Sequence, residues 1–355
     1  MTLAPLSLPL LRRLDPERAH SVALAAMSLG LGGGRPEPGE DDGLGVTALG
    51  MRFPNPIGIA AGFDKDARVP ATLARLGFGF VEAGTVTPLP QAGNPKPRLF
   101  RLPEEGAVIN RMGFNNQGLD RFVARLERLR ARSGPGVPFG ANLGINKEGA
   151  DPPRDYARLV RVLAPLSDYL VINLSSPNTP GLRALQQVER MRELLDAATQ
   201  AAPARPPLLV KLAPDLEDDV LAEIVETVIA AGIDGLIVSN TLLARPPTLT
   251  GRHAGEAGGL SGRPLRARST AMLVRIARLS AGRLTLIGCG GIESGADILE
   301  KVRAGAHLVQ IYTRFAYEGP GLLPRLKREL RAALAAGGWP SLEAARSAGP
   351  IGEER

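Results

Sequence analysis

The chain has 355 residues, with 43 Lys and Arg against 36 Asp and Glu, a formal net charge of +7 and a sequence pI near 10.0. A basic balance of this kind permits a nucleic-acid or acidic-membrane partner. However, the arginines are spread along helix-like stretches such as residues 121–132 and aromatic residues make up only 4%, so we expect no nucleic-acid partner.

Cysteine usage and the first residues favour a reducing compartment. The single cysteine, Cys289, excludes an internal disulfide and a multi-cysteine metal site, and we expect no metal. Arg12 and Arg13 follow the first apolar stretch, whereas a secretory signal carries its positive charge ahead of that stretch. The apolar stretch 21–34 is shorter than the roughly 20 residues that a spanning helix needs. We therefore expect a cytoplasmic chain with no membrane span.

The first forty residues differ from the rest. Asp15 and Pro16 form a strong helix start, a side-chain cap followed by proline, and the helix that follows runs into glycines at 32–34. A second short helix is expected ahead of it, within residues 3–14, and GGGRPEPGEDDG (32–43) is typical of an exposed linker. The sequence thus predicts an apolar helical extension over residues 1–40 and a larger domain over 41–355.

From residue 50 onward, short apolar runs rich in β-formers alternate with longer amphipathic runs. The predicted strands are 57–60, 80–86, 139–143, 169–174, 208–212, 235–239, 284–289 and 308–312. Buried parallel strands that alternate with helices favour an α/β fold, the closed (β/α)8 TIM barrel. An open doubly wound sheet is the alternative, but no G-x-G-x-x-G follows the first strand and no P-loop occurs.

One connection is unusually long. About fifty residues separate the second predicted strand from the third, and they include LPQAGNPKPRLFRLPEEGAVINRMGFNNQG. Long insertions on a compact domain are usually functional loops or lids. We expect this one to cover the mouth of the barrel.

Polar residues gather where the predicted strands end. In a barrel, the carboxyl ends of all strands meet at one rim, and catalytic groups come from several of them. In strand order, this rim carries AGFDKD (61–66), AGTVTP (83–88), ANLGINK (141–147), NLSSPNT (173–179), KLAPD (211–215), SNT (239–241), CGGI (289–292) and YTRF (312–315). Many donors and little negative charge suit a flat, carbonyl-rich, anionic ligand.

A phosphate site is expected on the same rim. Gly290 and Gly291 follow the seventh strand and Thr313 follows the eighth, which are the usual phosphate positions of a barrel. Gly262 in GGLSGRP, at the start of another expected helix, could join them. The rim combines a phosphate site with a wide ring of hydrogen-bond donors, and the sequence has no dinucleotide-binding motif. We therefore expect the cofactor to be flavin mononucleotide, FMN.

These motifs carry a family resemblance. AGFDKD, GTVTP, GNPKPRLFRL, NRMGFNN, NLSSPNTPGLR, VKLAPDL, SNT, GGLSGRPL and GGI, in this order and spacing, resemble the class 2 (quinone-dependent) dihydroorotate dehydrogenases. LDPERAH near the start is similar to the helical extension that separates this class from the soluble class 1 enzymes. The resemblance implies an FMN enzyme of pyrimidine (UMP) synthesis that oxidises (S)-dihydroorotate to orotate and passes electrons to a membrane quinone.

The resemblance also implies which residue accepts the substrate's proton. The matching position is Ser176, where class 1 relatives carry cysteine. Because a serine hydroxyl is a poor base, its own proton must leave through a water or hydroxyl chain, and Thr179 is the candidate for that chain.

The resemblance implies two further sets of residues. The substrate residues would be Lys65, Asn110, Arg111, Met112, Gly113, Phe114, Asn173, Asn178, Asn240 and Thr241. The FMN residues would be Ala61, Gly62, Phe63, Asp64, Lys65, Thr85, Asn142, Asn173, Lys211, Ser239, Gly262, Gly291, Tyr312 and Thr313. Lys211 would lie near N1 of the ring, where reduced flavin carries negative charge.

By the same resemblance, the quinone would approach through the N-terminal helices. His20, Arg101 and Tyr312 match positions near the quinone tunnel. An apolar helix pair too short to span can lie in the membrane interface, helped by arginines and anionic lipid. We expect a monomer bound peripherally to the cytoplasmic side of the cell membrane.

Two other enzymes remain as alternatives. One is a class 1 type enzyme that uses fumarate or NAD, against which Ser176 and residues 1–40 argue. The other is a phosphate-binding barrel lyase or isomerase without flavin.

Overall fold

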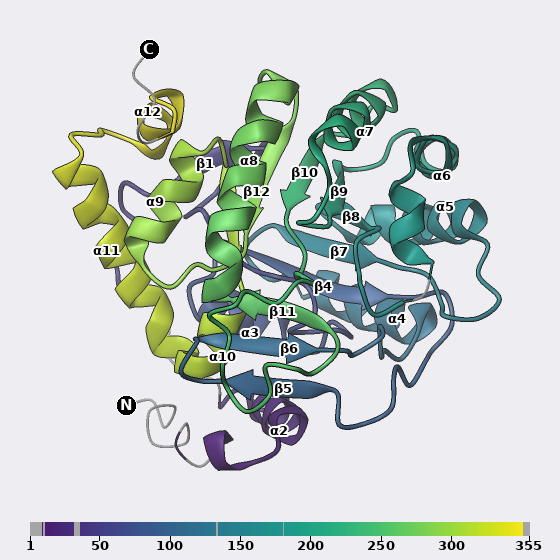
Figure 1. The fold of residues 1–355 in the computed structure, drawn as a ribbon, viewed down its shortest axis with the longest axis horizontal. Helices are drawn as coiled ribbons and strands as arrows, with labels where there is room; N and C mark the ends of the chain where they lie inside the picture. Colours follow the sequence, from purple (N-terminus) through teal and green to yellow (C-terminus); the bar gives the residue numbers. More distant parts are fainter. Residues whose placement is uncertain (1–8, 10, 32–35, 133, 180, 351–355) are drawn as a thin grey trace.

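The computed structural model describes residues 9, 11–31, 36–132, 134–179 and 181–350, and within them eight parallel strands close into a barrel (Figure 1). Around the barrel, the order is β10 (Gly235–Val238), β12 (Thr285–Cys289), β13 (Leu308–Ile311), β3 (Ile57–Ile59), β4 (Phe80–Val86), β7 (Phe139–Leu143), β8 (Tyr169–Asn173) and β9 (Leu208–Leu212). The predicted TIM barrel is confirmed. Four strands end one residue earlier than predicted and β12 begins one residue later.

Helices form the outer layer of the barrel (Figure 1). They are α3 (Pro70–Arg75), α4 (Leu119–Arg130), α5 (Pro152–Leu163), α6 (Val188–Gln200), α7 (Asp218–Ala230), α8 (Arg266–Ser280), α9 (Gly295–Arg303), α10 (Thr313–Glu318), α11 (Leu322–Ala336) and α12 (Leu342–Ser347). Side-chain capping marks where two of these helices begin. The side chain of Asp151 caps α5 ahead of two prolines, and Ser294 and Asp297 form a reciprocal capping box on α9.

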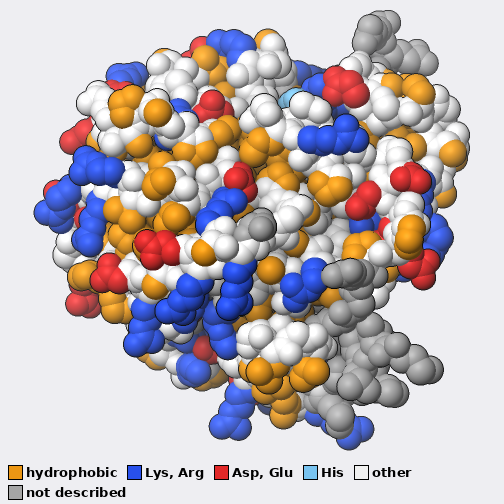
Figure 2. All heavy atoms as spheres, turned by 180° about the vertical axis from the view of Figure 1, so that it is seen from behind, with side chains coloured by type: hydrophobic (Ala, Val, Ile, Leu, Met, Phe, Trp, Pro, Cys, Tyr) orange, Lys and Arg blue, Asp and Glu red, His pale blue; other side chains and the backbone are white. Residues whose placement is uncertain are grey.

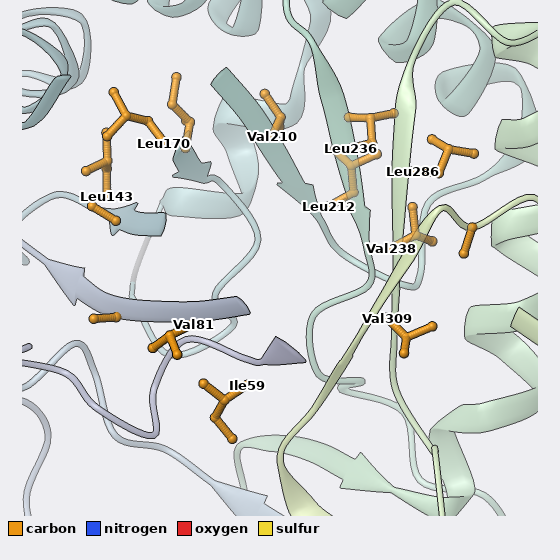
Figure 3. Packing of buried hydrophobic residues seen from close by; sticks show 14 of the residues in the cluster. Ile59, Val81, Leu143, Leu170, Val210, Leu212, Leu236, Val238, Leu286 and Val309 are labelled. Atoms are coloured by element: carbon orange, nitrogen blue, oxygen red, sulfur yellow. The ribbon is translucent and has the colours of Figure 1, made fainter. Parts of the chain in front are cut away.

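Side chains on the barrel strands alternate between the barrel interior and the helical layer. Aliphatic residues of the outer faces pack with the helices in one large core; ten of them are labelled in Figure 3, including Val81, Leu170 and Val309. A separate interior core holds Phe80, Tyr169, Val171, Leu209, Ile237, Ile287 and Leu308. Since strand side chains alternate with a period of two, the same alternation turns Glu82, Asn173, Lys211 and Gln310 inward.

The two ends of the barrel are closed differently. At the amino end, the hairpin of β1 (Val46–Ala48) and β2 (Met51–Phe53) places Ala48 and Phe53 against the interior core. At the other end lies an antiparallel sheet of β5 (Leu99–Leu102), β6 (Ala107–Asn110) and β11 (Gly259–Gly262). The long insertion supplies β5 and β6, and Gly262 ends a strand before the turn that leads to α8. The sequence did not predict this three-stranded sheet.

The predicted N-terminal helix is α2 (Pro16–Ser28), which packs against β5. The Asp15 side chain caps it by accepting from the N–H groups of Glu17 and Arg18. The Thr72 hydroxyl donates to the carbonyl of Met27, which joins the helix to α3. Most of the short helix expected within residues 3–14, and part of the expected linker, lie outside the described residues, so the division at residue 40 stays a prediction.

No helix in the described part of the chain combines the length and the apolar character that crossing a bilayer requires. At the lower edge of Figure 1, where α2 lies, the opposite view shows hydrophobic and basic side chains exposed next to one another (Figure 2). Val22 on α2 is exposed, as are Leu29 and Leu31, which follow the helix.

Candidate active site

A cavity of about 1330 Å³, counted with its open mouth, lies at the carboxyl ends of the barrel strands under the β5–β6–β11 sheet. Most residues expected to bind substrate or FMN line it. They are Ala61, Gly62, Lys65, Thr85, Asn110, Met112, Gly113, Phe114, Asn173, Asn178, Lys211, Ser239, Asn240, Thr241, Gly262, Gly291, Tyr312 and Thr313, together with Ser176. The barrel topology therefore brings residues that are far apart in the sequence to one cavity.

The antiparallel sheet is fastened to the rim beside Ser176. The amide nitrogen of Asn178 donates to the side-chain oxygen of Asn110 on β6, at 3.2 Å, and to its carbonyl, at 3.1 Å. The Asn94 amide donates to the carbonyls of Arg111 and Asn178, at 3.0 and 3.2 Å. The loop that follows β8 and the long insertion thus form one wall.

The predicted base and its relay are both buried in that wall. The Ser176 hydroxyl lines the cavity and accepts from the N–H of Asn178, at 3.3 Å. Thr179 does not line the cavity, and its buried hydroxyl oxygen has no hydrogen-bond partner among the described residues. Because an unpaired buried hydroxyl is costly, this oxygen is available to a water or a neighbouring hydroxyl.

Lys65 and Lys211 bring positive charge into the cavity. Lys65 donates to the carbonyl of Gly62, at 2.9 Å, and burial lowers the pKa of Lys65 to about 8. Lys211 on β9 is only 5% exposed, and within the described residues no hydrogen bond or ion pair reaches its ammonium. A buried ammonium without a partner favours an anionic or acceptor group in the cavity.

The predicted phosphate positions, Gly290, Gly291 and Thr313, also line the cavity. Gly290 and Gly291 adopt φ of +117° and +75°, a conformation that favours glycine. No hydrogen bond from the N–H of Gly291 is found in the described part of the chain, so this donor is free for a ligand. Thr313 begins α10 and its hydroxyl donates to the hydroxyl of Ser261 on β11, at 2.9 Å.

Four side chains of the expected FMN and substrate sets lie outside the cavity wall. Asn142 is buried inside the barrel, and Asp64 accepts from the N–H groups of Arg68 and Val69 in the turn after β3. Arg111 pairs with Glu256, at 2.7 Å. Phe63 lines a second cavity, beside α2. Any contact that these residues make with a ligand stays a prediction.

The second cavity, of about 1410 Å³ counted with its opening, lies between α2 and the barrel and is lined mainly by apolar residues. The three residues expected near the quinone, His20, Arg101 and Tyr312, all line it, and His20 and Tyr312 also line the first cavity. His20 Nε2 lies 2.8 Å from the carbonyl oxygen of Phe63. Burial and the charge of Lys65 lower the pKa of His20 to about 4, so its ring is neutral near pH 7.

Sequence reasoning missed several residues at the site. Glu17 of α2, Ser261 and Cys289 line the first cavity, and Glu82 lies fully buried below it. A sequence signal existed for Glu82, since a single carboxylate in the apolar run FVEAGTV is unusual in a buried strand. No sequence signal marked Glu17, because its contacts depend on how α2 packs against the barrel.

A closed barrel with a polar cavity at its carboxyl rim is the architecture of a TIM-barrel enzyme. The family model for dihydroorotate dehydrogenase matches residues 43–334. The dihydroorotate dehydrogenase (quinone) of Rhodospirillum rubrum is 54% identical over 95% of this chain and 92% of its own length. The enzyme of the same name from Azorhizobium caulinodans is 50% identical over 96% of this chain and 98% of its own.

Solved structures agree with the sequence relatives. Eimeria tenella DHODH in complex with ferulenol is 40% identical, with a TM-score of 0.89 over 93% of this chain and 94% of that chain. The ligand-free type of Eimeria tenella DHODH gives a TM-score of 0.90, with 93% of this chain and 98% of that chain covered. The chain therefore belongs to the dihydroorotate dehydrogenase family, and the resemblance to the quinone-dependent class is confirmed.

Proposed function

We propose that this protein oxidises dihydroorotate to orotate in pyrimidine synthesis, with FMN as its cofactor and a quinone as the electron acceptor. The observation that carries the proposal is a pair of adjoining cavities that share His20 and Tyr312 in their walls. One cavity is polar and lies at the barrel mouth, and the other is mainly apolar and lies beside α2. This arrangement suits a charged substrate on one side of a flavin and a lipid-soluble acceptor on the other.

The residues present fit FMN. The partnerless ammonium of Lys211 suits the anionic side of a reduced flavin ring, and the free N–H of Gly291 suits the phosphate. Gly262 and Thr313 would hold the phosphate with Gly291, while Thr85, Asn173 and Lys211 would hold the ring. When bound, FMN supplies a hydride acceptor at the barrel mouth.

The substrate would lie under the antiparallel sheet. Lys65 would pair with its carboxylate, and Asn110, Asn173, Asn178 and Asn240 would bind the ring amides, because carboxamides offer both donors and acceptors. The Met112–Phe114 segment would close over it and limit access of water.

Ser176 would take the proton from the carbon next to the one that gives up hydride. The Ser176 hydroxyl would pass its own proton on as it accepts the substrate's, since it is a poor base alone. The buried hydroxyl of Thr179, which has no partner in the described structure, supports its assignment to that relay.

The second cavity would admit the quinone from a membrane surface. Val22 and Leu29, which are exposed on and after α2, support contact with a bilayer. Figure 2 shows hydrophobic and basic side chains exposed next to one another at the lower edge of the molecule, which suits an anionic surface. We therefore also propose that the protein attaches peripherally to the cell membrane, on its cytoplasmic side.

An anaerobic titration of the purified protein with dihydroorotate tests the function. We expect a yellow protein whose flavin absorbance bleaches with one equivalent of substrate and recovers on addition of a short-chain quinone. A colourless protein that gains no flavin absorbance after FMN is added would favour the flavin-free lyase or isomerase. Recovery with fumarate or NAD in place of quinone would favour the class 1 type.

A further inference from the structure

Glu82 is a buried carboxylate that no step of the proposed reaction uses. It lies on β4, its side chain is 0% exposed, and it points into the barrel below the first cavity. Three side chains donate to it: the amide of Asn142 at 2.8 Å, the amide of Gln310 at 2.5 Å and the hydroxyl of Tyr169 at 3.3 Å. Burying a carboxylate costs free energy even when it is hydrogen-bonded, so a merely space-filling role would suit an apolar residue better.

The carboxylate determines which way the Asn142 amide faces. An ionised carboxylate only accepts hydrogen bonds, so the NH₂ group of Asn142 must face Glu82 and the Asn142 oxygen must face away from it. That oxygen accepts from the hydroxyl of Thr85, at 2.6 Å, and from the amide of Asn173, at 3.1 Å. The amide orientation that Glu82 imposes on Asn142 therefore affects Thr85 and Asn173, which both line the first cavity.

The orientation of the Asn142 amide also restricts the orientation of the Asn173 amide. Because the NH₂ group of Asn173 faces Asn142 and Thr85, its oxygen faces the other way. There it accepts from the amide of Asn240, at 3.3 Å, and from the hydroxyl of Ser175, at 3.2 Å. The Ser175 oxygen in turn accepts from the Asn240 amide, at 2.9 Å.

The chain of amides ends at the rim of the cavity. The NH₂ group of Asn240 faces Asn173 and Ser175, which leaves its oxygen to accept from the N–H of Thr241, at 2.7 Å. Asn173, Asn240 and Thr241 all line the cavity. A reversed amide at any link would put two donors or two acceptors face to face.

We propose that Glu82 is a positioning residue for the reaction: its carboxylate fixes the direction of the Asn142 amide so that it agrees with the direction that the backbone N–H groups of Ser175 and Thr241 favour at Asn173 and Asn240. The asparagines at the cavity then present their donors and acceptors in a single arrangement that matches the amides of the substrate ring. Glu82 touches neither substrate nor flavin in this role and acts through its hydrogen-bond partners, chiefly Asn142. The part of the inference that concerns substrate rests on the proposed function; the direction of the amides does not.

The variant Glu82→Gln tests the inference with almost no change in volume. A glutamine offers both an acceptor and a donor, so it accommodates Asn142 in either orientation. The fold should tolerate it, because the buried oxygen of Gln310, which has no hydrogen-bond partner among the described residues, can accept from the new NH₂ group if its amide turns over. Because Thr85 and Asn173 would also hold the flavin ring, the FMN content of the variant is measured first and orotate binding is compared at full FMN occupancy.

Orotate binding, followed through the change it causes in flavin absorbance, measures the effect at the site. We expect Glu82→Gln to weaken orotate binding and to raise KM for dihydroorotate at least tenfold, with a smaller effect on kcat. Tyr169→Phe is the matched control, since it removes another donor to the same carboxylate and leaves the amides untouched. Equal weakening in both variants, or none in Glu82→Gln, would overturn the proposal.

A double-mutant cycle tests whether Glu82 acts through Asn142. If it does, Glu82→Gln combined with Asn142→Ala weakens orotate binding no more than Asn142→Ala alone. Additive losses would show that Glu82 acts by another route and would overturn the proposal.

An atomic-resolution crystal structure of Glu82→Gln decides the amide direction without any substrate. Nitrogen and oxygen are distinguished at that resolution. We expect the Asn142 amide to be reversed or to occupy both orientations, and a network unchanged from wild type would overturn the inference. Failure of the wild type to reduce its flavin with dihydroorotate would instead refute the proposed function, while this crystallographic measurement would still decide the role of Glu82.

Discussion

The carboxylate of Glu17 on α2 forms a two-point ion pair with Arg98, which lies immediately before β5. The two bonds measure 2.6 Å from Nη2 and 3.1 Å from Nε, and Lys96 approaches the same carboxylate at 3.3 Å. Arg98, only 6% exposed, also donates to the carbonyls of Ala92 and Asn94. Since Asn94 in turn bonds the loop after β8, the pair connects the N-terminal helix to the wall of the first cavity.

Glu17→Gln should loosen α2 from the barrel. The substitution leaves the buried guanidinium of Arg98 without its counter-charge, which costs about 3 kcal/mol of unfolding free energy. Urea denaturation measures this loss. Glu189→Gln is the control. Glu189 also lies in the first turn of a helix, α6, but its side chain is exposed. Equal stabilities of the two variants would contradict the prediction.

The contribution of Glu17 should depend on pH in a defined direction. Burial by itself raises the pKa of Glu17, but the hydrogen bonds and charges of Arg98 and Lys96 outweigh it and hold the pKa below 4.5. A carboxyl with a depressed folded-state pKa contributes stability above its unfolded pKa and loses it as the pH falls through the folded value. The difference in unfolding free energy between wild type and Glu17→Gln should be constant above that range and shrink in acid. A difference that grows on acidification would refute this sign.

The sequence was sufficient for the barrel, because buried parallel strands and amphipathic helices have distinct periods. All eight barrel strands were predicted within one residue at each end. The rim residues followed, since the carboxyl ends of parallel strands must converge. The β5–β6–β11 sheet was missed because β11 comes from a segment about 150 residues beyond β6, so no local pattern in the sequence indicates that the two strands pair.

Residues that act through partners on other strands could not be predicted from one sequence. Glu82 could be noticed as an odd carboxylate in a buried strand, but its role depends on Asn142 of β7 and Gln310 of β13. Asn142 was expected to touch FMN because of the family resemblance. In the structure it contacts Thr85 and Asn173, and its contact with FMN stays a prediction.

Ser176→Ala should separate binding from chemistry. The variant keeps the cavity and its lysines, so it should bind FMN and orotate normally. Without the hydroxyl, reduction of the flavin by dihydroorotate should slow at least about a hundredfold, the usual scale for loss of a general base. Anaerobic stopped-flow absorbance measures this rate. Ser280→Ala, a buried serine on α8 away from the cavity, serves as control. A reduction rate near that of wild type would exclude Ser176 as the base.

Orotate binding should weaken at alkaline pH. Desolvation lowers the pKa of Lys65 to about 8, so its ammonium loses its charge as the pH rises through that value, while the orotate carboxylate stays ionised. Above pH 8, the dissociation constant should rise by about tenfold per pH unit. Lys65→Ala should bind weakly with no such dependence, whereas Lys147→Ala, an exposed lysine on the neighbouring rim, should keep it. A dependence that persists in Lys65→Ala would assign the titration to another group.

Two adjacent alanines on α2 allow the quinone cavity to be tested without truncating the chain. Ala26 lines the second cavity, whereas Ala25 is exposed on the helix surface and lines neither cavity. Ala26→Phe should fill part of the apolar cavity and slow reoxidation of the reduced flavin by a short-chain quinone at least tenfold, because the acceptor loses its place beside Tyr312. Reduction by dihydroorotate should stay unchanged, since the first cavity is untouched. Ala25→Phe makes the same change in helix propensity without entering the cavity, so its reoxidation should match that of wild type. If Ala26→Phe reoxidises as fast as Ala25→Phe, quinone does not reach the flavin through this cavity.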